Sequence, residues 1–216
     1  MEDAANFNKM ASTGLAPVYP ALAQYITDTF YLAKKNGIGI DLGSGPGDLI
    51  VELCKRTDSL YWINADINPN YFTFFFDKAI KAGVAHRVGA VFADAQSLPF
   101  RCDYADIIVS RGCFEFWEDK TMGFGEVYRV HKPGGVAFIG RGYSENLPAD
   151  VAVSIRKERG DGGPKYETDS TAADLRRMMT ALSITDYRII IPKPKNATVK
   201  YGIWIRITKK IPGAGK

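Results

Sequence analysis

The sequence predicts an α/β fold, in which helices cover both faces of a mostly parallel sheet that ends in an antiparallel hairpin. Apolar runs of strand length alternate with helically periodic segments between residues 20 and 142. A turn with three closely spaced glycines, GSGPG at 43–47, links the first such run to a helix. Near the C-terminus, two further runs flank the turn PKPKNAT at 192–198, and strands joined this way are antiparallel neighbours.

Helices are predicted where apolar residues recur every three or four positions. Gly37 is expected to end the first helix, and Ser170 is a plausible N-cap of the last. The helix after the second strand should turn a row of apolar residues inward, namely Phe72, Phe75, Phe76, Ala79 and Ile80. The expected helices span 20–37, 47–57, 68–83, 120–131 and 170–183.

Strands are predicted where short apolar runs lie between turn residues. The parallel strands should be those that alternate with helices, and the last two should form the hairpin. The expected strands span 38–43, 60–67, 87–95, 104–110, 134–142, 186–191 and 199–209.

Length and composition indicate one domain over 1–216, since 216 residues with 46% hydrophobic content suffice for one core. Within it, 1–36 should form an N-terminal helical cover. Residues 143–168 include the stretch RKERGDGGPKYE, which is rich in charge and glycine. We expect this segment to form a mobile loop on the substrate side of the site.

Several protein classes are disfavoured by the composition. The three cysteines form no C-x-x-C pair and the two histidines lie far apart, which argues against a disulfide framework and a metal site. No apolar run reaches the roughly 20 residues of a membrane span, and the N-terminus is polar and acidic. We therefore expect a cytoplasmic protein without a membrane span or bound metal.

The net charge of +4 is uneven, because eight Lys or Arg residues and no acid follow Asp186. This basic end would suit an anionic partner. Alternatively, its lysines keep an edge hairpin from pairing with other strands.

The glycine turn suggests a nucleotide-like ligand. Asp41 ends a strand, Gly43-x-Gly45-x-Gly47 follows, and a helix starts at Asp48, so backbone N–H groups would face an open cleft. The spacing is G-x-G-x-G, not the G-x-G-x-x-G of dinucleotide sites, and an acid at the helix start would repel a pyrophosphate. These features argue against a dehydrogenase. A tight turn without a ligand is the alternative.

Two further acids stand at the ends of the next strands. Asp66 lies 19 residues past Gly47, where a carboxylate can accept hydrogen bonds from ribose hydroxyls. It is alternatively a helix cap before Pro69. Asp94 can accept from an exocyclic amine such as adenine N6, or it is simply a loop acid.

Five stretches together resemble a known family. They are IDLGSGPGDL, NADINPNYF, FADAQSLPF, YADIIVSRGCFEFWED and EVYRVHKPGGVAFI, and their order and spacing over about 37–140 resemble class I S-adenosylmethionine-dependent methyltransferases. They are most similar to the small-molecule branch with the ubiquinone and menaquinone biosynthesis methyltransferases. The resemblance implies a Rossmann-like, seven-stranded sheet, S-adenosylmethionine as cofactor and S-adenosylhomocysteine as product.

The resemblance also implies roles for individual residues. Tyr19, in LAPVYPALA, resembles a family tyrosine near the cofactor carboxylate, although Pro20 stands in place of the usual acid. The methionine part would meet Asp41, Gly43, Ser44, Gly45 and Gly47. The adenosine part would meet Asp66, Ile67, Asp94 and Ala95, and the ammonium would meet the end of the fourth strand at Ser110 and Arg111.

Methyl transfer is an in-line displacement that needs alignment and exclusion of water, with a base for some acceptors. We consider Glu115 a candidate base, Arg111 and Arg141 a candidate clamp for an anionic acceptor, and Tyr143 a candidate wall of the acceptor site. The alternatives are a surface ion pair for Glu115, a structural salt bridge for the arginines and a core position for Tyr143. Cys113 and Glu145 lie in the same region.

The sequence thus favours methyl transfer to a small organic molecule. An RNA methyltransferase is the second hypothesis; it fits the basic C-terminus, but no N-P-P-[YF] tetrapeptide follows the fourth strand. A third is a catalytically silent subunit that binds the cofactor for a partner protein.

Overall fold

The computed structural model of the chain describes residues 3–159, 167–211 and 213. The helices in these residues are α1 (Ala4–Ser12), α2 (Val18–Thr29), α3 (Asp48–Cys54), α4 (Tyr71–Lys81), α5 (Lys120–Val130), α6 (Ala149–Arg159) and α7 (Thr168–Ala181), with short 3-10 turns η1 (Ala85–Arg87) and η2 (Phe114–Phe116). The strands are β1 (Asn36–Leu42), β2 (Ser59–Asp66), β3 (Val88–Phe92), β4 (Ala105–Arg111), β5 (His131–Gly142), β6 (Tyr187–Ile190) and β7 (Gly202–Thr208).

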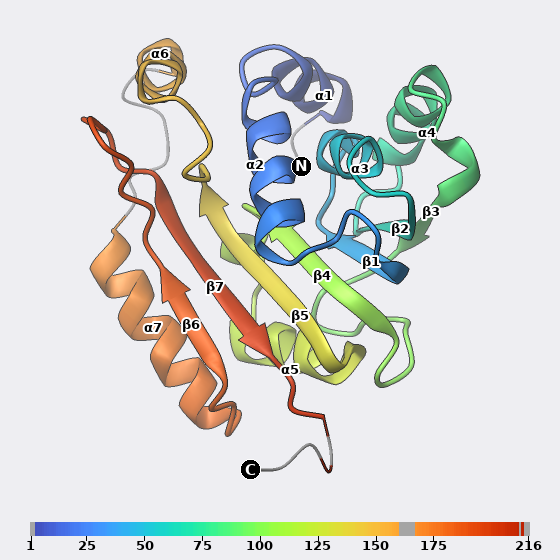
Figure 1. Cartoon of the computed structure of the whole chain (residues 1–216), viewed down its shortest axis with the longest axis vertical. Helices are drawn as coiled ribbons and strands as arrows, with labels where there is room; N and C mark the ends of the chain where they lie inside the picture. Colours follow the sequence, from blue (N-terminus) through green and yellow to red (C-terminus); the bar gives the residue numbers. More distant parts are fainter. Residues whose placement is uncertain (1–2, 160–166, 212, 214–216) are drawn as a thin grey trace.

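The strands form one twisted seven-stranded sheet in the order β3-β2-β1-β4-β5-β7-β6 (Figure 1). β1 to β5 are parallel, whereas β7 pairs antiparallel with both β5 and β6. The predicted Rossmann-like fold with a C-terminal antiparallel hairpin is therefore confirmed. The strand order reverses between β1 and β4, which is where sheets of this type open a crevice beyond their carboxyl ends.

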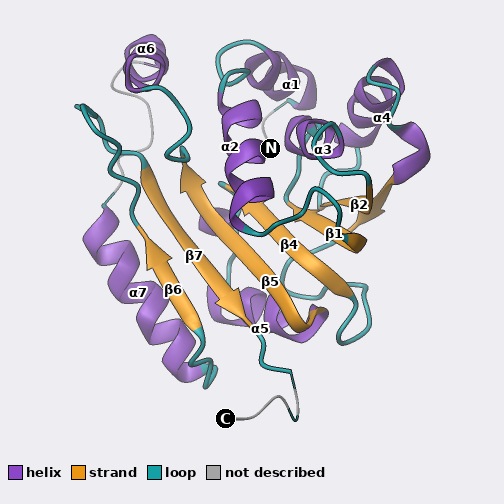
Figure 2. Cartoon of the chain, in the orientation of Figure 1, coloured by secondary structure: helices purple, strands orange, loops and turns teal. Residues whose placement is uncertain are grey.

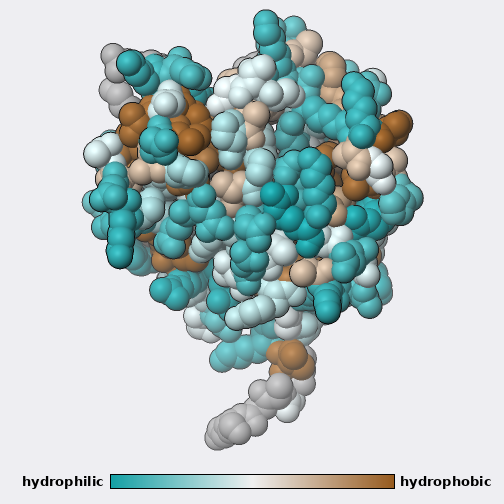
Figure 3. Space-filling view, turned by 45° about the horizontal axis from the view of Figure 1, so that its top comes forward, coloured by the Kyte–Doolittle hydropathy of each residue, from teal (hydrophilic) through white to brown (hydrophobic). Residues whose placement is uncertain are grey.

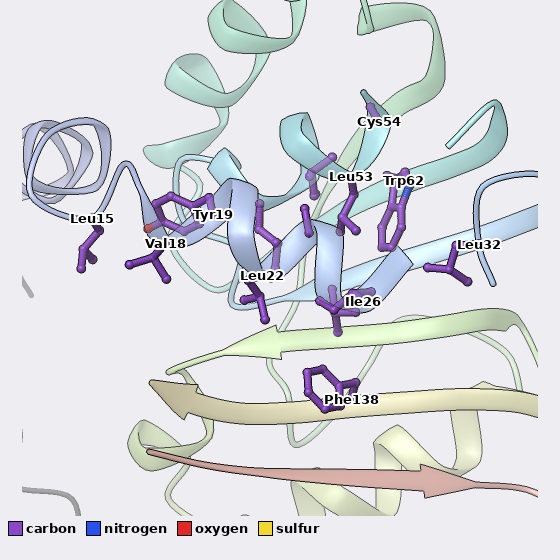
Figure 4. Packing of buried hydrophobic residues seen from close by; sticks show 14 of the residues in the cluster. Leu15, Val18, Tyr19, Leu22, Ile26, Leu32, Leu53, Cys54, Trp62 and Phe138 are labelled. Atoms are coloured by element: carbon purple, nitrogen blue, oxygen red, sulfur yellow. The ribbon is translucent and has the colours of Figure 1, made fainter. Parts of the chain in front are cut away.

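Helices cover both faces of the sheet (Figure 2). On one face, α2, α3, α4 and α6 bury their apolar residues against side chains such as Trp62, Phe138 and Trp204. Figure 4 shows part of this core, with Leu22 and Ile26 of α2 above Phe138 of β5. On the other face, α5 and α7 cover isoleucines of β4 to β7. The helices on both faces pack against the sheet and so fix the positions of the carboxyl ends of the parallel strands.

Residues 149–159 differ from the prediction, because they form helix α6 and not a loop. Only Ala152 and Ile155 of this helix are buried, and the other side chains are mostly polar or charged. Two buried residues give too weak a periodicity to predict a helix from sequence. The remainder of RKERGDGGPKYE at 160–166 lies outside the described residues.

The inward face of α4 is narrower than predicted. Phe75 and Ala79 are fully buried, whereas the side chains of Phe76 and Ile80 are 38% and 65% exposed. This helix covers the end of the sheet, next to the outermost strand β3, so only one line of its residues has other elements beneath it (Figure 1). Phe72 is partly buried.

Gly37 does not end a helix, since α2 stops at Thr29 and Gly37 lies within β1. Its φ is 132°, and a Cβ here would lie 2.1 Å from Oδ2 of Asp106. That carboxylate accepts a hydrogen bond from the backbone N–H of Ile38 at 2.9 Å. The glycine therefore makes room for a side chain that binds the start of β1.

Among the described residues, each helix is too short or too polar to cross a bilayer. The same part of the chain holds no group of three or more His, Cys, Asp or Glu side chains that would bind a metal ion.

Candidate functional site

A cavity of about 390 Å³ opens at the carboxyl ends of the parallel strands, on the side of the switch point. It falls within the usual size range of small-molecule sites, about 300–1,000 Å³. Its walls come from the ends of β1 to β4, from α1 and from the segment after β4. The lining residues are Phe7, Leu42, Gly43, Gly45, Asp66, Ile67, Asn68, Tyr71, Ala93, Asp94, Ala95, Gln96, Arg111, Gly112, Cys113, Phe116 and Trp117.

The glycine loop after β1 is held to the end of β2 by three hydrogen bonds. The N–H of Gly43 donates to the carbonyl of Ala65 at 2.7 Å, and the N–H of Gly45 donates to Oδ2 of Asp66 at 2.7 Å. The amide of Asn64 donates to the carbonyl of Gly45 at 2.9 Å. The loop is thus fixed before any ligand arrives, which reduces the entropy that binding must overcome.

Glycine is required in this loop because other side chains pack directly against its backbone. Gly43 and Gly45 have φ of 68° and 57°, in the left-handed region. A Cβ on Gly43 would lie 2.3 Å from Cβ of Cys113, and a Cβ on Gly45 would lie 3.2 Å from the ring of Phe7. A side chain at Gly43 would therefore displace the cavity wall.

Gly47 serves the fold and does not line the cavity. It is the N-cap of α3 with φ of 78°, and a Cβ here would lie 2.1 Å from the ring of Phe75. The ring of Phe75 is fully buried, so the missing side chain allows α4 to pack closely on the start of α3.

Asp66 lines the cavity at the end of β2, and both of its carboxylate oxygens accept a backbone hydrogen bond. Besides the N–H of Gly45, the N–H of Asn68 donates to Oδ1 at 2.8 Å. Burial raises the pKa of Asp66, and these N–H groups oppose the rise. Because each oxygen has two lone pairs, the carboxylate can still accept bonds from a ligand.

Asp94 lines the same cavity just beyond β3, with Ile67 and Ala95. Its Oδ1 accepts a hydrogen bond from the N–H of Gln96 at 2.9 Å. No hydrogen bond to its Oδ2 is found among the described residues, so this oxygen is available to a ligand. Ile67 is 59% exposed at the rim.

Asp41 is only 2% exposed at the end of β1 and lies outside the cavity lining. Burial raises the pKa of its carboxyl to about 7; the nearby charge of Asp66 adds to this, and the charge of Arg111 opposes it. Ser44 also lies outside the cavity lining. A buried carboxylate so close to a ligand site favours the approach of a cation.

Ser110 is buried at the end of β4, outside the lining, next to the cavity residue Cys113. The Ser110 Oγ and the Cys113 Sγ are 2.9 Å apart, and the thiol donates to the carbonyl of Leu42 at 3.1 Å. Burial raises the pKa of Cys113 to about 12. The thiol therefore stays protonated and fills space between β1 and β4.

Arg111 lines the cavity and joins β4 to two other elements. Its Nε donates to the carbonyl of Gly142 at 3.2 Å, and its guanidinium lies 5.5 Å from the ring centre of Tyr19. Burial raises the pKa of Tyr19 to about 12, against the charge of Arg111. Tyr19 itself lines a different hollow, between α2, α3 and α4.

Glu115 lies outside the cavity lining and forms an ion pair with Arg141, with Nη1 and Oε2 3.0 Å apart. This geometry favours the surface ion-pair alternative over the candidate base. Arg141, which was expected to clamp an anionic acceptor together with Arg111, is thus paired with an acid of the protein itself.

We predict that Glu115→Gln retains turnover within about threefold of wild type, because a partly exposed ion pair contributes only about 0–1 kcal/mol. Methyl transfer from labelled cofactor, measured with any acceptor that the chain methylates, tests this. Glu126→Gln, which removes the acid of the partly exposed Arg129 pair on α5, is the matched control. A loss of about 100-fold or more in Glu115→Gln alone would restore the base role.

Tyr143 lies in the core beside α6, not in the cavity lining. Its ring meets that of Tyr201 edge-on, with centres 5.5 Å apart, and its N–H donates to the carbonyl of Tyr201 at 2.7 Å. The core alternative therefore describes its position, and a role at the acceptor site stays a proposal.

Sequence reasoning missed several lining or supporting residues. Asn64 carried a signal, because it is a polar residue two positions before Asp66 in an apolar strand and therefore lies on the same face. No sequence pattern predicts that Phe7 and Tyr71 line the cavity, because their positions depend on how α1 packs against α4. The two rings meet there with centres 5.7 Å apart.

Known proteins with similar sequences were found for the part of the chain that builds this site. Residues 40–139 match a family described as a methyltransferase domain. The chain is 37% identical over 97 residues to the ubiquinone/menaquinone biosynthesis C-methyltransferase of Vibrio campbellii, which covers 44% of this chain and 38% of that protein. It is 34% identical over 106 residues to the chloroplastic 2-methyl-6-phytyl-1,4-hydroquinone methyltransferase of Spinacia oleracea, covering 49% of this chain and 30% of that protein. The match thus spans well under half the length of these relatives.

Solved structures extend the similarity to nearly the whole chain. A candidate S-adenosyl-L-methionine-dependent methyltransferase of Methanococcus maripaludis superposes with a TM-score of 0.84 at 28% identity, covering 98% of this chain and 94% of that one. An S-adenosylmethionine-dependent methyltransferase of Aquifex aeolicus, at 17% identity and a TM-score of 0.68 over 96% of this chain and 100% of that one, shares the fold.

Proposed function

We propose that this chain, which belongs to the class I S-adenosylmethionine-dependent methyltransferases, transfers a methyl group from that cofactor to a small organic molecule. One observation carries the proposal. A single cavity takes its lining from the glycine loop after β1, from Asp66 at the end of β2 and from Asp94 beyond β3. Three neighbouring strand ends thus present a bare backbone and two acids to one ligand, in the order that an adenosine-bearing cofactor requires.

The residues present fit S-adenosylmethionine. Gly43 and Gly45 let the loop backbone pass close to Cys113 and Phe7 at the cavity wall, and both acids keep acceptor capacity for ribose hydroxyls and an adenine amine. The buried carboxylate of Asp41 would neutralise the ammonium of the methionine part. Arg111, beside Tyr19, would balance the cofactor carboxylate or an anionic acceptor.

The cofactor supplies an electrophilic methyl group on a sulfonium. The chain would align the acceptor with this methyl group and exclude water from the site. The rings of Phe7 and Trp117 line the cavity and exclude water from its apolar side. They favour an acceptor with an apolar or aromatic part. The two relatives named for quinone and hydroquinone methylation agree with this class of acceptor.

Residue roles follow from these positions. Gly43, Gly45, Asp66, Asp94 and Arg111 would touch the cofactor or acceptor. Outside the lining, Asp41 would act on the ammonium through its charge. The other residues would act through neighbours or through the backbone, namely Tyr19, Ser44, Gly47 and Ser110.

The test is binding followed by turnover. Calorimetric titration of the chain with S-adenosylmethionine should give a saturable 1:1 isotherm, which Gly43→Val should abolish. A Gly83→Val variant is the matched control, because Gly83 also has positive φ but no atom would lie within 4 Å of a Cβ at that position. No binding by the wild-type chain would refute the proposal.

Labelled methyl donor should then be incubated with a library of small acceptors and, separately, with RNA. Incorporation into a small molecule supports the proposal. Incorporation into RNA alone would favour the second hypothesis, and binding without incorporation in any arm would favour a silent subunit.

A further inference from the structure

Strand β3 is the outer edge of the sheet beyond β2, and no described element covers its free side (Figure 1). The segments on either end of this strand turn inward. Arg87 donates to the carbonyls of Thr57 and Cys54, and the carbonyl of Leu98 accepts from Arg129 of α5. The main chain of 88–92 therefore borders open space on one side.

This edge lacks the features that usually prevent strands from pairing between molecules. The strand reads VGAVF and contains no charge and no proline. One side chain in the described part of the chain reaches its backbone, since the hydroxyl of Tyr61 donates to the carbonyl of Val88 at 2.9 Å. The side of β3 that faces away from β2 pairs with no other described strand, so its main-chain groups other than the Val88 carbonyl can pair with one.

The opposite edge of the same sheet is protected. β6 is only four residues long, it carries the exposed Arg188, and Pro192, Lys193 and Pro194 follow it closely. Short length, charge and proline are the usual defences of an edge strand. The edge strand β6 has the charge, proline and short length that prevent pairing, whereas the edge strand β3 is uncharged and has no proline. This difference favours a pairing partner for β3.

One side of α4 carries an apolar stripe. With 3.6 residues per turn, Phe72, Phe76 and Ile80 align on the side of α4 opposite to Lys78, which pairs with Asp48 of α3 at 2.6 Å. The stripe therefore points away from α3, and α4 lies at the end of the sheet that β3 forms (Figure 1). The space-filling view shows a small group of hydrophobic side chains on the side where α4 lies and a larger group at the upper left (Figure 3).

Phe92 extends the apolar surface from the strand itself. It ends β3 and is 60% exposed. The stripe and the strand are together called the edge surface, which comprises Phe72, Phe76, Ile80 and residues 88–92. An exposed apolar surface of this kind on a helix next to an open strand edge typically marks an interaction site.

We propose that the edge surface binds a second copy of this chain, with the two β3 strands pairing antiparallel about a two-fold axis. The surface is self-complementary in this arrangement. Pairing centred on Ala90 sets Val88 opposite Phe92 of the second copy, and both are apolar. Apolar cross-strand pairs of this kind stabilise a strand ladder, and a two-fold interface uses the same surface on both copies.

The same arrangement brings the two α4 stripes together above the joined sheet. Apolar side chains then cover each other as the helices approach across the axis. The resulting dimer continues the sheet through fourteen strands, seven from each copy. A different protein would need its own matching edge and stripe, whereas a second copy supplies both by symmetry.

Light scattering coupled to size exclusion tests the proposal on the full chain, loaded at concentrations between about 1 and 100 µM. The wild-type chain should elute with twice the mass of one chain at the upper end of this range. Ile80→Glu and, separately, Phe76→Glu should raise the dimer dissociation constant roughly tenfold or more, because each places two like charges at the axis. Met122→Glu on α5 is the matched control, as Met122 is also exposed, by 54%.

Hydrogen exchange measured by mass spectrometry gives an independent result. Amides of 88–92 should exchange more slowly at high concentration in wild type and not in Ile80→Glu. Circular dichroism must show that the variants stay folded. A wild-type chain that is monomeric up to about 100 µM would overturn the proposal. So would a dimer that resists both α4 variants or leaves 88–92 unprotected.

Discussion

Replacing Asp41 by asparagine should make the free protein more stable at pH 8 by up to about 4 kcal/mol. The carboxyl is buried at the end of β1 and its pKa is raised from 3.8 to about 7. Each tenfold difference in proton affinity between folded and unfolded chains corresponds to about 1.4 kcal/mol. The amide has nearly the same shape and no charge to desolvate, so the cost of the ionised group disappears.

The sign of the pH dependence follows from the direction of the shift. Between about pH 4 and pH 7 the folded chain holds a proton on Asp41 that the unfolded chain has lost. The contribution of Asp41 to the free energy of unfolding therefore falls as pH rises from about 4 to about 7, and it is constant above that range. The difference between Asp41→Asn and wild type should be near zero at pH 4 and grow to its full size by pH 8.

Urea unfolding at several pH values measures this difference, and subtraction removes the titration of all other groups. Asp58→Asn, at an exposed position, is the matched control. If the difference between Asp41→Asn and wild type does not change from pH 4 to pH 8, Asp41 does not titrate in this window.

The same substitution should weaken S-adenosylmethionine binding by about 10- to 100-fold, because the cofactor ammonium would lose the attraction of a nearby buried negative charge. Stability and binding would then move in opposite directions at one residue. Such a trade-off is typical of a charge that is kept at a site for a ligand and not for the fold.

Much of the fold could be predicted because periodicity reports which side of an element is covered. The order of strands and helices, the parallel sheet and the antiparallel hairpin all follow from local patterns and turn residues. The errors arose where burial depends on distant parts of the chain. Phe76 and Ile80 look like core residues in sequence, yet α4 lies at the end of the sheet and leaves them exposed.

The site could be predicted in part, for a related reason. Strand ends of a parallel sheet meet at one edge, so Gly43, Gly45, Asp66 and Asp94 could be placed together from sequence. The sequence could not show which side chain each glycine makes room for, such as Cys113 at Gly43 and the Phe75 ring at Gly47. Those neighbours depend on how distant segments of the chain pack against the turn.

Replacing Asp66 by asparagine should be nearly as damaging as replacing it by alanine. Both carboxylate oxygens accept backbone N–H groups, from Gly45 at 2.7 Å and from Asn68 at 2.8 Å. An asparagine has only one acceptor oxygen, so its NH₂ group must face one of these donors. One N–H loses its partner, and hydrogen bonds to charged groups contribute about 1.5–3 kcal/mol each.

Asp94→Asn is the matched control within the same cavity. Among the described residues, hydrogen bonds to the Asp94 carboxylate reach Oδ1 alone, so an asparagine can keep its oxygen there. We expect Asp66→Asn to lose about 2 kcal/mol or more in unfolding free energy and at least about 100-fold in cofactor affinity, whereas Asp94→Asn should lose less than about 1 kcal/mol in stability. Urea unfolding and calorimetric titration at about pH 7.5 measure both quantities. Equal stability of the two variants would mean that Asp66 does not hold the glycine loop, and that its raised pKa reflects burial without a structural role.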